Sequence, residues 1–162
     1  MLKKRLGIEA IEREWYDNFI FNCFKIPTTL IIPENCRLIG YSAFQNCKML
    51  EEVKIPRFTK TISYCAFLDC SNLKEVVISE GVENIGDEAF RGCKRLREVI
   101  IPKSVESIGH QGFWRCDNAI VILRKPMIEF KKVGSSAFYK CKSVEYAEEE
   151  TGDRSYRGKS VE

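Results

Sequence analysis

The sequence predicts an α/β solenoid in which short parallel strands and short helical turns recur about every 23 residues. The first observation is that isoleucine opens four consecutive blocks, at positions 32, 55, 78 and 101. The second and third are columns of cysteine and phenylalanine at fixed offsets. They are Cys47, Cys70, Cys93, Cys116 and Cys141, and Phe44, Phe67, Phe90, Phe113 and Phe138. Because a period of this length is typical of stacked repeat units, one repeated fold accounts for most of the chain.

Each block is expected to end in a short strand with one buried face. The pattern LxxVxI, as in Leu73, Val76 and Ile78, places apolar residues at alternate positions at its end, which is typical of a half-buried strand. Three blocks carry proline at their second position: Pro33, Pro56 and Pro102. Since proline lacks the N–H that a sheet needs, it should mark the residue where the strand leaves the sheet. A second extended segment, such as Val82–Ile85, adds two more inward residues.

Two further positions shape the rest of each block. The ninth is glycine in four blocks (Gly40, Gly86, Gly109 and Gly134) and Ser63 in the other, which predicts a positive φ or a close approach between backbones. The Ala-Phe-x-x-Cys segment that follows is expected to form a short helical turn. There the alanine and cysteine, four residues apart, face one core. Each phenylalanine should then stack on its equivalent in the next coil.

The recurring cysteines are predicted to be small buried thiols, because free cysteine is among the most buried residue types. Disulfides are disfavoured, since neighbours in a column point in parallel into the core. A zinc site is disfavoured by the absence of a CxxC pair and by the single histidine. Cys36 occupies a position held by valine in other blocks and is expected to be a core substitution. No cofactor or metal is predicted.

The repeat IPxxVxxIGxxAFxxCxxLxxVxI resembles the BspA-like leucine-rich repeats, also called the Treponema pallidum type. The resemblance covers Ile32 to about Val144. It implies a curved leucine-rich-repeat solenoid with parallel strands. It also implies a surface role in adhesion or host interaction. The segment 124–132 departs from the pattern and makes its repeat two residues longer.

We expect three regions. Residues 1–31 form a capping helix and a degenerate first coil, because Ile8, Ile11, Trp15 and Phe19 follow helical spacing. Residues 32–146 form the solenoid, with a partial fifth repeat around 126–146. Residues 147–162 close the last coil and end in a flexible tail.

Composition excludes several classes of protein. With 162 residues, 44% hydrophobic and 30% charged, the chain is not a disordered polar one. No apolar run is long enough for a membrane-spanning helix, and acidic residues follow the basic cluster at residues 3–5 where a signal peptide needs an apolar run. We therefore expect a cytoplasmic location if the chain is full length, and a secreted or cell-surface one if it is a fragment. The net charge of +3 does not predict a nucleic-acid partner.

Catalysis is not expected. His110 is the only histidine and falls in a solvent-side slot of its repeat, so no Ser/His/Asp or Cys/His set can be assembled. The segment Gly152–Ser160 superficially suggests a phosphate-binding loop. Its spacing is one residue too long, and neither a preceding strand nor a following helix is available. The basic and aromatic residues of the turns are most simply a solvated ridge.

Binding is predicted on the outward face of the block-ending strands. If the twenty-second position points inward, the flanking positions point outward; they are Glu52, Glu75, Glu98 and Val121, and Lys54, Val77, Ile100 and Leu123. An apolar stripe beside an acidic one favours a protein-contact surface, although segment 124–132 could instead cover it. The predicted function is a non-catalytic protein-protein interaction module. The alternative is a cell-surface adhesion module binding host protein or glycan, and the identity of the partner and the oligomeric state stay open.

Overall fold

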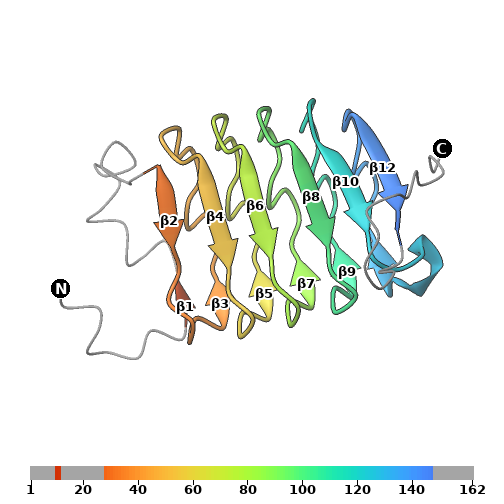
Figure 1. Ribbon diagram of the computed structural model, residues 1–162, viewed down its shortest axis with the longest axis horizontal. Coiled ribbons are helices and arrows are strands. Elements are labelled where there is room, and N and C mark those ends of the chain that lie inside the picture. The colour runs from red at the N-terminus through yellow and green to blue at the C-terminus, as the bar shows by residue number, and fades with distance from the viewer. Residues whose placement is uncertain (1–9, 12–27, 148–162) are drawn as a thin grey trace.

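The computed structural model describes residues 10–11 and 28–147 and shows a parallel β-solenoid of about five turns (Figure 1). Each coil contributes one longer and one shorter strand. The longer strands are β2 (Thr29–Ile31), β4 (Glu52–Ile55), β6 (Glu75–Ile78), β8 (Glu98–Ile101), β10 (Ile120–Leu123) and β12 (Ser143–Tyr146). The shorter strands are β1 (Ala10–Ile11), β3 (Leu38–Ile39), β5 (Thr61–Ile62), β7 (Asn84–Ile85), β9 (Ser107–Ile108) and β11 (Lys132–Val133).

The strands stack in the order of the coils. The longer strands form two three-stranded parallel sheets, β2-β4-β6 and β8-β10-β12, which lie in one row in Figure 1. The shorter strands form a six-stranded sheet in the order β1-β3-β5-β7-β9-β11. Because Val53 pairs with Val76, 23 residues further on, equivalent residues of these coils lie side by side. Strands β4 and β8 end immediately before Pro56 and Pro102, as predicted from the missing N–H of proline.

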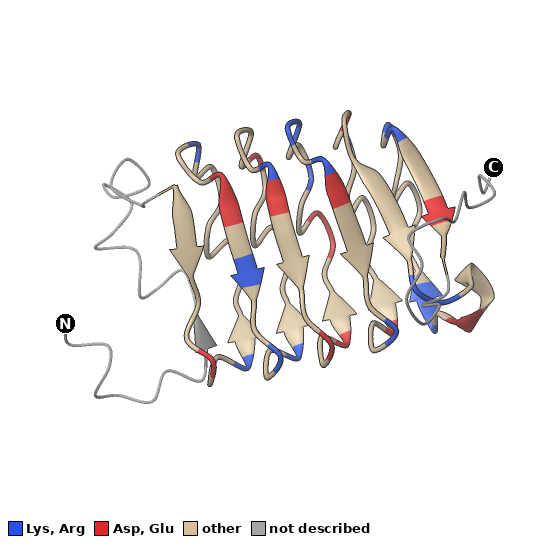
Figure 2. Cartoon of the chain, viewed as in Figure 1, with Lys and Arg blue, Asp and Glu red and all other residues tan. Residues whose placement is uncertain are grey.

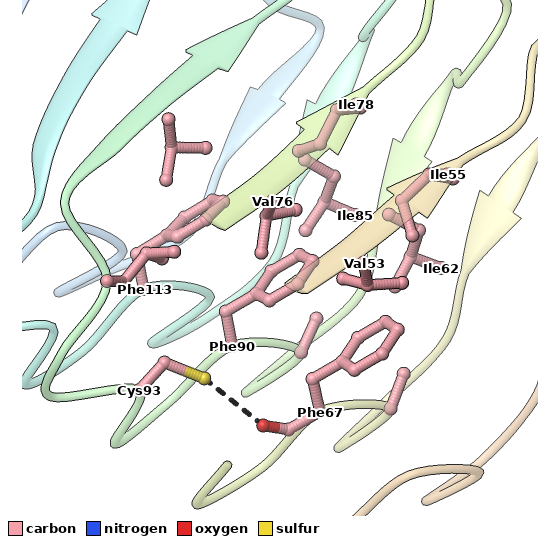
Figure 3. Close-up of a cluster of buried hydrophobic side chains, with 14 of the residues drawn as sticks. Val53, Ile55, Ile62, Phe67, Val76, Ile78, Ile85, Phe90, Cys93 and Phe113 are labelled. Atoms are coloured by element: carbon pink, nitrogen blue, oxygen red, sulfur yellow. Dashed lines mark hydrogen bonds between the residues drawn. The ribbon is translucent and has the colours of Figure 1, made fainter. Parts of the chain in front are cut away.

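The core is built from columns of equivalent side chains (Figure 3). The five phenylalanine rings stack in sequence, with centroids of neighbouring rings 5.1–5.9 Å apart. Phe44, Phe67, Phe90 and Phe113 are fully buried. The predicted stacking is therefore confirmed. One coil cannot bury its own face, and each ring is covered by the ring of the coil beside it.

The turns that carry these phenylalanines are not helical, so the α/β description is wrong. In every such turn two residues have a left-handed backbone, for example Cys65 with φ 56° and Asp69 with φ 55°. Between them, alternate N–H groups leave the coil: Phe67 N donates to Ala89 O of the next coil at 2.7 Å. An α-helix needs every N–H to bond four residues back within its own segment. Successive β-turns, bonded to the next coil, replace it.

The capping helix expected within residues 1–31 is also not supported. Ala10 and Ile11 form β1, which pairs with β3 as an outer strand of the six-stranded sheet. The rest of the expected helix and the predicted tail at 147–162, apart from residue 147, lie outside the described residues. The single helical element of the described chain is η4, a 3-10 turn at Met127–Glu129 in the longer repeat.

The cysteine column is confirmed as a set of buried free thiols. Cys47, Cys70, Cys93 and Cys116 are fully buried and Cys141 is partly buried. Each thiol from Cys70 onward donates to the phenylalanine carbonyl of the preceding coil, as Cys93 Sγ does to Phe67 O at 3.3 Å (Figure 3). That carbonyl also accepts the N–H of Cys70 at 3.2 Å. A small side chain with a weak donor fits here because it links two coils without needing water.

These thiols are expected to resist alkylation in the folded protein. Burial raises the pKa of Cys93 well above its ordinary value and that of Cys141 to about 12. Since the thiolate is the nucleophile, only about one part in 10⁴ of Cys141 is reactive at about pH 8, and the raised pKa of Cys93 slows its reaction in the same way. Iodoacetamide followed by peptide mass spectrometry should find both residues unmodified in native protein and fully modified in guanidinium chloride. Rapid native modification of Cys93 would contradict its place in the core.

Candidate protein-binding surface

The outward side of the longer strands, here called the strand face, carries two adjacent columns of exposed residues. In β4, β6 and β8 exposed and buried residues alternate, because successive side chains of a strand point to opposite sides. The first outward residue of each is acidic: Glu52, Glu75 and Glu98 form the acidic column. The second outward residues form the other column, which is Lys54, Val77 and Ile100. All six of these sequence-predicted residues are exposed.

The acidic column places like charges next to one another (Figure 2). Glu52 and Glu75 are direct partners across β4 and β6, and like charges in that relation are destabilising. Glu52 accepts a hydrogen bond from Thr29 Oγ1 at 3.2 Å. In the part of the chain that the structure describes, the carboxylates of Glu75 and Glu98 have no ion-pair or side-chain hydrogen-bond partner. The column therefore presents two carboxylates that have no ion-pair partner among the described residues.

The second column is apolar along much of its length. The side chains of Val77 and Ile100 are 42% and 36% exposed, and Ile31 of β2 is 87% exposed. Lys54 interrupts the column between Ile31 and Val77. An exposed run of large apolar residues on neighbouring strands is unusual for a solvated surface, which makes this column a candidate contact surface.

Strand β10 corrects two of the predicted site residues. Val121 and Leu123 were expected to point outward, and both are fully buried. The distance from Cys116 to Val121 is one residue shorter than the equivalent distance from Cys93 to Val99, so Val121 pairs with Val99. A slip of one residue exchanges the two faces of a strand. The outward residues of β10 are Ile120 and Ile122, both partly exposed, and Ile122 pairs with Ile100.

Ile122 thus extends the apolar stripe, defined here as Val77, Ile100 and Ile122. A shallow hollow of about 530 Å³ lies over β4, β6 and β8 and is lined by members of both columns. Its lining residues include Glu52, Glu75, Glu98, Val77 and Ile100. A second hollow of about 460 Å³ continues toward β2, where Ile31 and Lys54 line it.

Segment 124–132 does not cover this surface, although the sequence left that possibility open. Val77 and Ile100 keep their exposure with the segment in place. Figure 1 shows the segment looping out beyond the end of β10, beside β11. Its Phe130 packs into the core, while Ile128 is 92% exposed. Among the residues that the structure describes, nothing covers the strand face.

The other candidate sites considered from the sequence are His110, the basic and aromatic residues of the turns, and clusters of metal-ligating residues. His110 is exposed and its Nδ1 lies 2.7 Å from Ser135 Oγ, in keeping with the predicted solvent-side slot. Among the basic and aromatic residues of the turns, the guanidinium carbon of Arg91 lies 4.6 Å from the centroid of the Trp114 ring. Arg91 Nη1 also forms an ion pair with Glu88 Oε2 at 2.7 Å. Across residues 10–11 and 28–147, no three His, Cys, Asp or Glu side chains are grouped as metal ligands. The strand face is the best candidate for binding.

Comparisons with known proteins agree with this architecture. The BspA-type leucine-rich repeat region matches residues 16–145 in six copies. A leucine-rich repeat protein from Bacteroides ovatus is 32% identical over 70% of this chain, with a TM-score of 0.60. The Treponema pallidum leucine-rich repeat protein is 26% identical over 73%, with a TM-score of 0.67. A leucine-rich cell surface protein from Faecalibacterium prausnitzii is 24% identical over 87%, with a TM-score of 0.61, which shows a shared fold.

The solved relatives are longer than this chain. It spans 28%, 58% and 43% of the Bacteroides, Treponema and Faecalibacterium proteins. No curated protein matches it significantly. Among the described residues, no helix has the length and apolarity needed to cross a membrane.

Proposed function

Because the chain belongs to the BspA-type leucine-rich repeat family, we propose that it binds another protein through its strand face and has no catalytic role. Leucine-rich repeats are typically protein-interaction modules, and their stacked coils present an extended surface. The single observation that carries the proposal is the exposed apolar stripe of Val77, Ile100 and Ile122 beside the acidic column. Burying such side chains in a complex removes apolar area from water, at about 25 cal/mol per Å².

The proposal is tested by placing charge on the stripe. The double variant Val77→Arg/Ile100→Arg should weaken partner binding about 100-fold or more, since central interface residues dominate binding energy. Its free energy of unfolding should change by about 1 kcal/mol or less, because both side chains are already partly exposed. Proteins captured from native cells would be identified by mass spectrometry, and the affinity of a purified partner measured by calorimetry.

A matched control places two arginines elsewhere on the surface. Phe58 and Ile128 are exposed apolar residues outside the strand face, so Phe58→Arg/Ile128→Arg should bind the partner as the wild type does. Equal loss of binding in both double variants would contradict the proposed surface. A loss of stability in Val77→Arg/Ile100→Arg as large as that of a core variant would show that the stripe is buried.

The alternative function, adhesion at a cell surface, would use the same strand face. The two functions differ in the location of the partner, which is outside the cell for adhesion. Labelling of intact cells with an antibody against the chain distinguishes between them. Labelling of unpermeabilised cells supports adhesion, whereas labelling that requires permeabilisation supports a partner inside the cell.

A further inference from the structure

We infer that the partner docks a cationic and apolar polypeptide segment on the strand face, with Lys or Arg residues over the acidic column and apolar residues over the stripe. This inference rests on the proposed function and adds the chemistry of the partner. Glu75 and Val77, like Glu98 and Ile100, are two residues apart on one strand, so their side chains emerge roughly 7 Å apart on the same face. The hollow over β4, β6 and β8 is lined by all four residues.

The charge of this face indicates which partner fits. Lys74, at the rim of the hollow, is engaged with Glu51 at 2.7 Å. Arg97 lines the same hollow and makes no ion pair within the described residues, and Lys54 lies outward on β4. None of these cations forms an ion pair with Glu75 or Glu98, so an incoming Lys or Arg can pair with those two carboxylates.

The apolar stripe sets the second requirement. Successive coils lie about 4.8 Å apart, so the two columns run side by side along the solenoid axis. A segment that follows this axis meets carboxylates on one side and apolar side chains on the other. An acidic segment or a nucleic acid would meet the acidic column with like charge, which electrostatic complementarity disfavours.

The test is selection of random 15-residue peptides displayed on phage against the full chain. Recovered peptides are expected to combine several Lys or Arg residues with large apolar ones. Their affinity, measured by fluorescence anisotropy, should fall roughly tenfold in Glu75→Gln/Glu98→Gln, as expected for the loss of two exposed ion pairs. The matched control Asp117→Asn/Glu129→Gln removes two exposed carboxylates elsewhere and should leave affinity unchanged.

The melting temperature distinguishes a binding role of these two carboxylates from a structural one. Because the acidic column repels itself, Glu75→Gln/Glu98→Gln should melt at the same temperature as the wild type or higher. A lower melting temperature would show that the carboxylates support the fold, and would overturn the inference.

The outcomes separate this inference from the proposed function. Selected peptides that are acidic or uncharged, and that lose binding in Val77→Arg/Ile100→Arg but not in Glu75→Gln/Glu98→Gln, would overturn the cationic partner and leave the proposed function standing. Peptides that bind both variants as well as the wild type would overturn both. Dimerisation of the purified chain that Val77→Arg/Ile100→Arg abolishes would assign the face to a second copy and overturn the cationic segment.

Discussion

Replacement of Phe90 by alanine is expected to lower the free energy of unfolding by about 3–5 kcal/mol. Phe90 is fully buried and stacks on Phe67 and Phe113, with both centroid distances 5.1 Å. The substitution removes a large apolar side chain and breaks two ring contacts at once. It also leaves a cavity in the middle of the array, where coils on both sides depend on the ring. Urea unfolding followed by circular dichroism measures the loss.

Tyr41→Ala is the matched control for this prediction. Tyr41 also stacks on an equivalent residue of the next coil, with its ring centroid 5.3 Å from that of Tyr64, but its side chain is 57% exposed. Its removal should cost about 1 kcal/mol or less, since most of its apolar area is already in water. Comparable losses in the two variants would mean that stacking, rather than burial, stabilises the array. A loss below about 1 kcal/mol for Phe90→Ala would refute the phenylalanine column as the core.

The stacking of coils could be predicted because it follows directly from the period. When a strand pairs with another 23 residues away in parallel register, each recurring residue must meet its own equivalent. Phe67 and Phe90 therefore had to be neighbours, and Cys70 and Cys93 had to share one side of the core. No knowledge of the turn geometry was needed for either conclusion.

The turns could not be predicted from the same pattern. Alanine and cysteine four residues apart fit a helix, but they also fit successive β-turns. The residue just before the cysteine distinguishes the two structures, because it is Asn46, Asp69 and Gly92 in three coils. These residue types tolerate the left-handed backbone that the structure shows there, and they are not typical of a helix interior.

The outward orientation of residues was predicted correctly in β4, β6 and β8, where an acidic residue opens each strand and so shows which positions face solvent. In β10 the four residues Ile120–Leu123 are all apolar, so the sequence pattern does not show which of them point inward and which outward. The first position of each block, which is isoleucine at 32, 55, 78 and 101, could have shown which residues of β10 point inward. Leu123 is apolar like those isoleucines, whereas Arg124, 23 residues after Ile101, is not. The missed residues of the candidate site, Ile120 and Ile122, follow from that single shift.

Gly109→Ala is expected to lower the free energy of unfolding by about 2–3 kcal/mol, as overpacking typically does. The glycine does not have a positive φ, so the alternative explanation, a close approach of backbones, is the correct one. A Cβ at Gly109 would lie 2.3 Å from Asp87 N and 2.5 Å from Gly86 C, both of which belong to the preceding coil. These backbone atoms belong to residues that hydrogen-bond to the coil before them, as Gly86 N does to Ile62 O, so they cannot move aside as a flexible side chain can and the two coils would have to separate.

The space available for an added Cβ differs between equivalent glycines, and Gly109 is a more crowded site than Gly86. At Gly86 the nearest atom to an added Cβ is Ser63 C at 2.7 Å, which is less severe than at Gly109. The control is Gly112→Ala, three residues further on, where four other coils carry alanine. There the nearest contact is Ile108 Cγ2, a side-chain atom, at 3.0 Å. Gly112→Ala should therefore change stability by less than about 1 kcal/mol. If thermal unfolding showed both substitutions to be equally mild, the coils would not be in contact at Gly109, and the close approach of their backbones would be refuted.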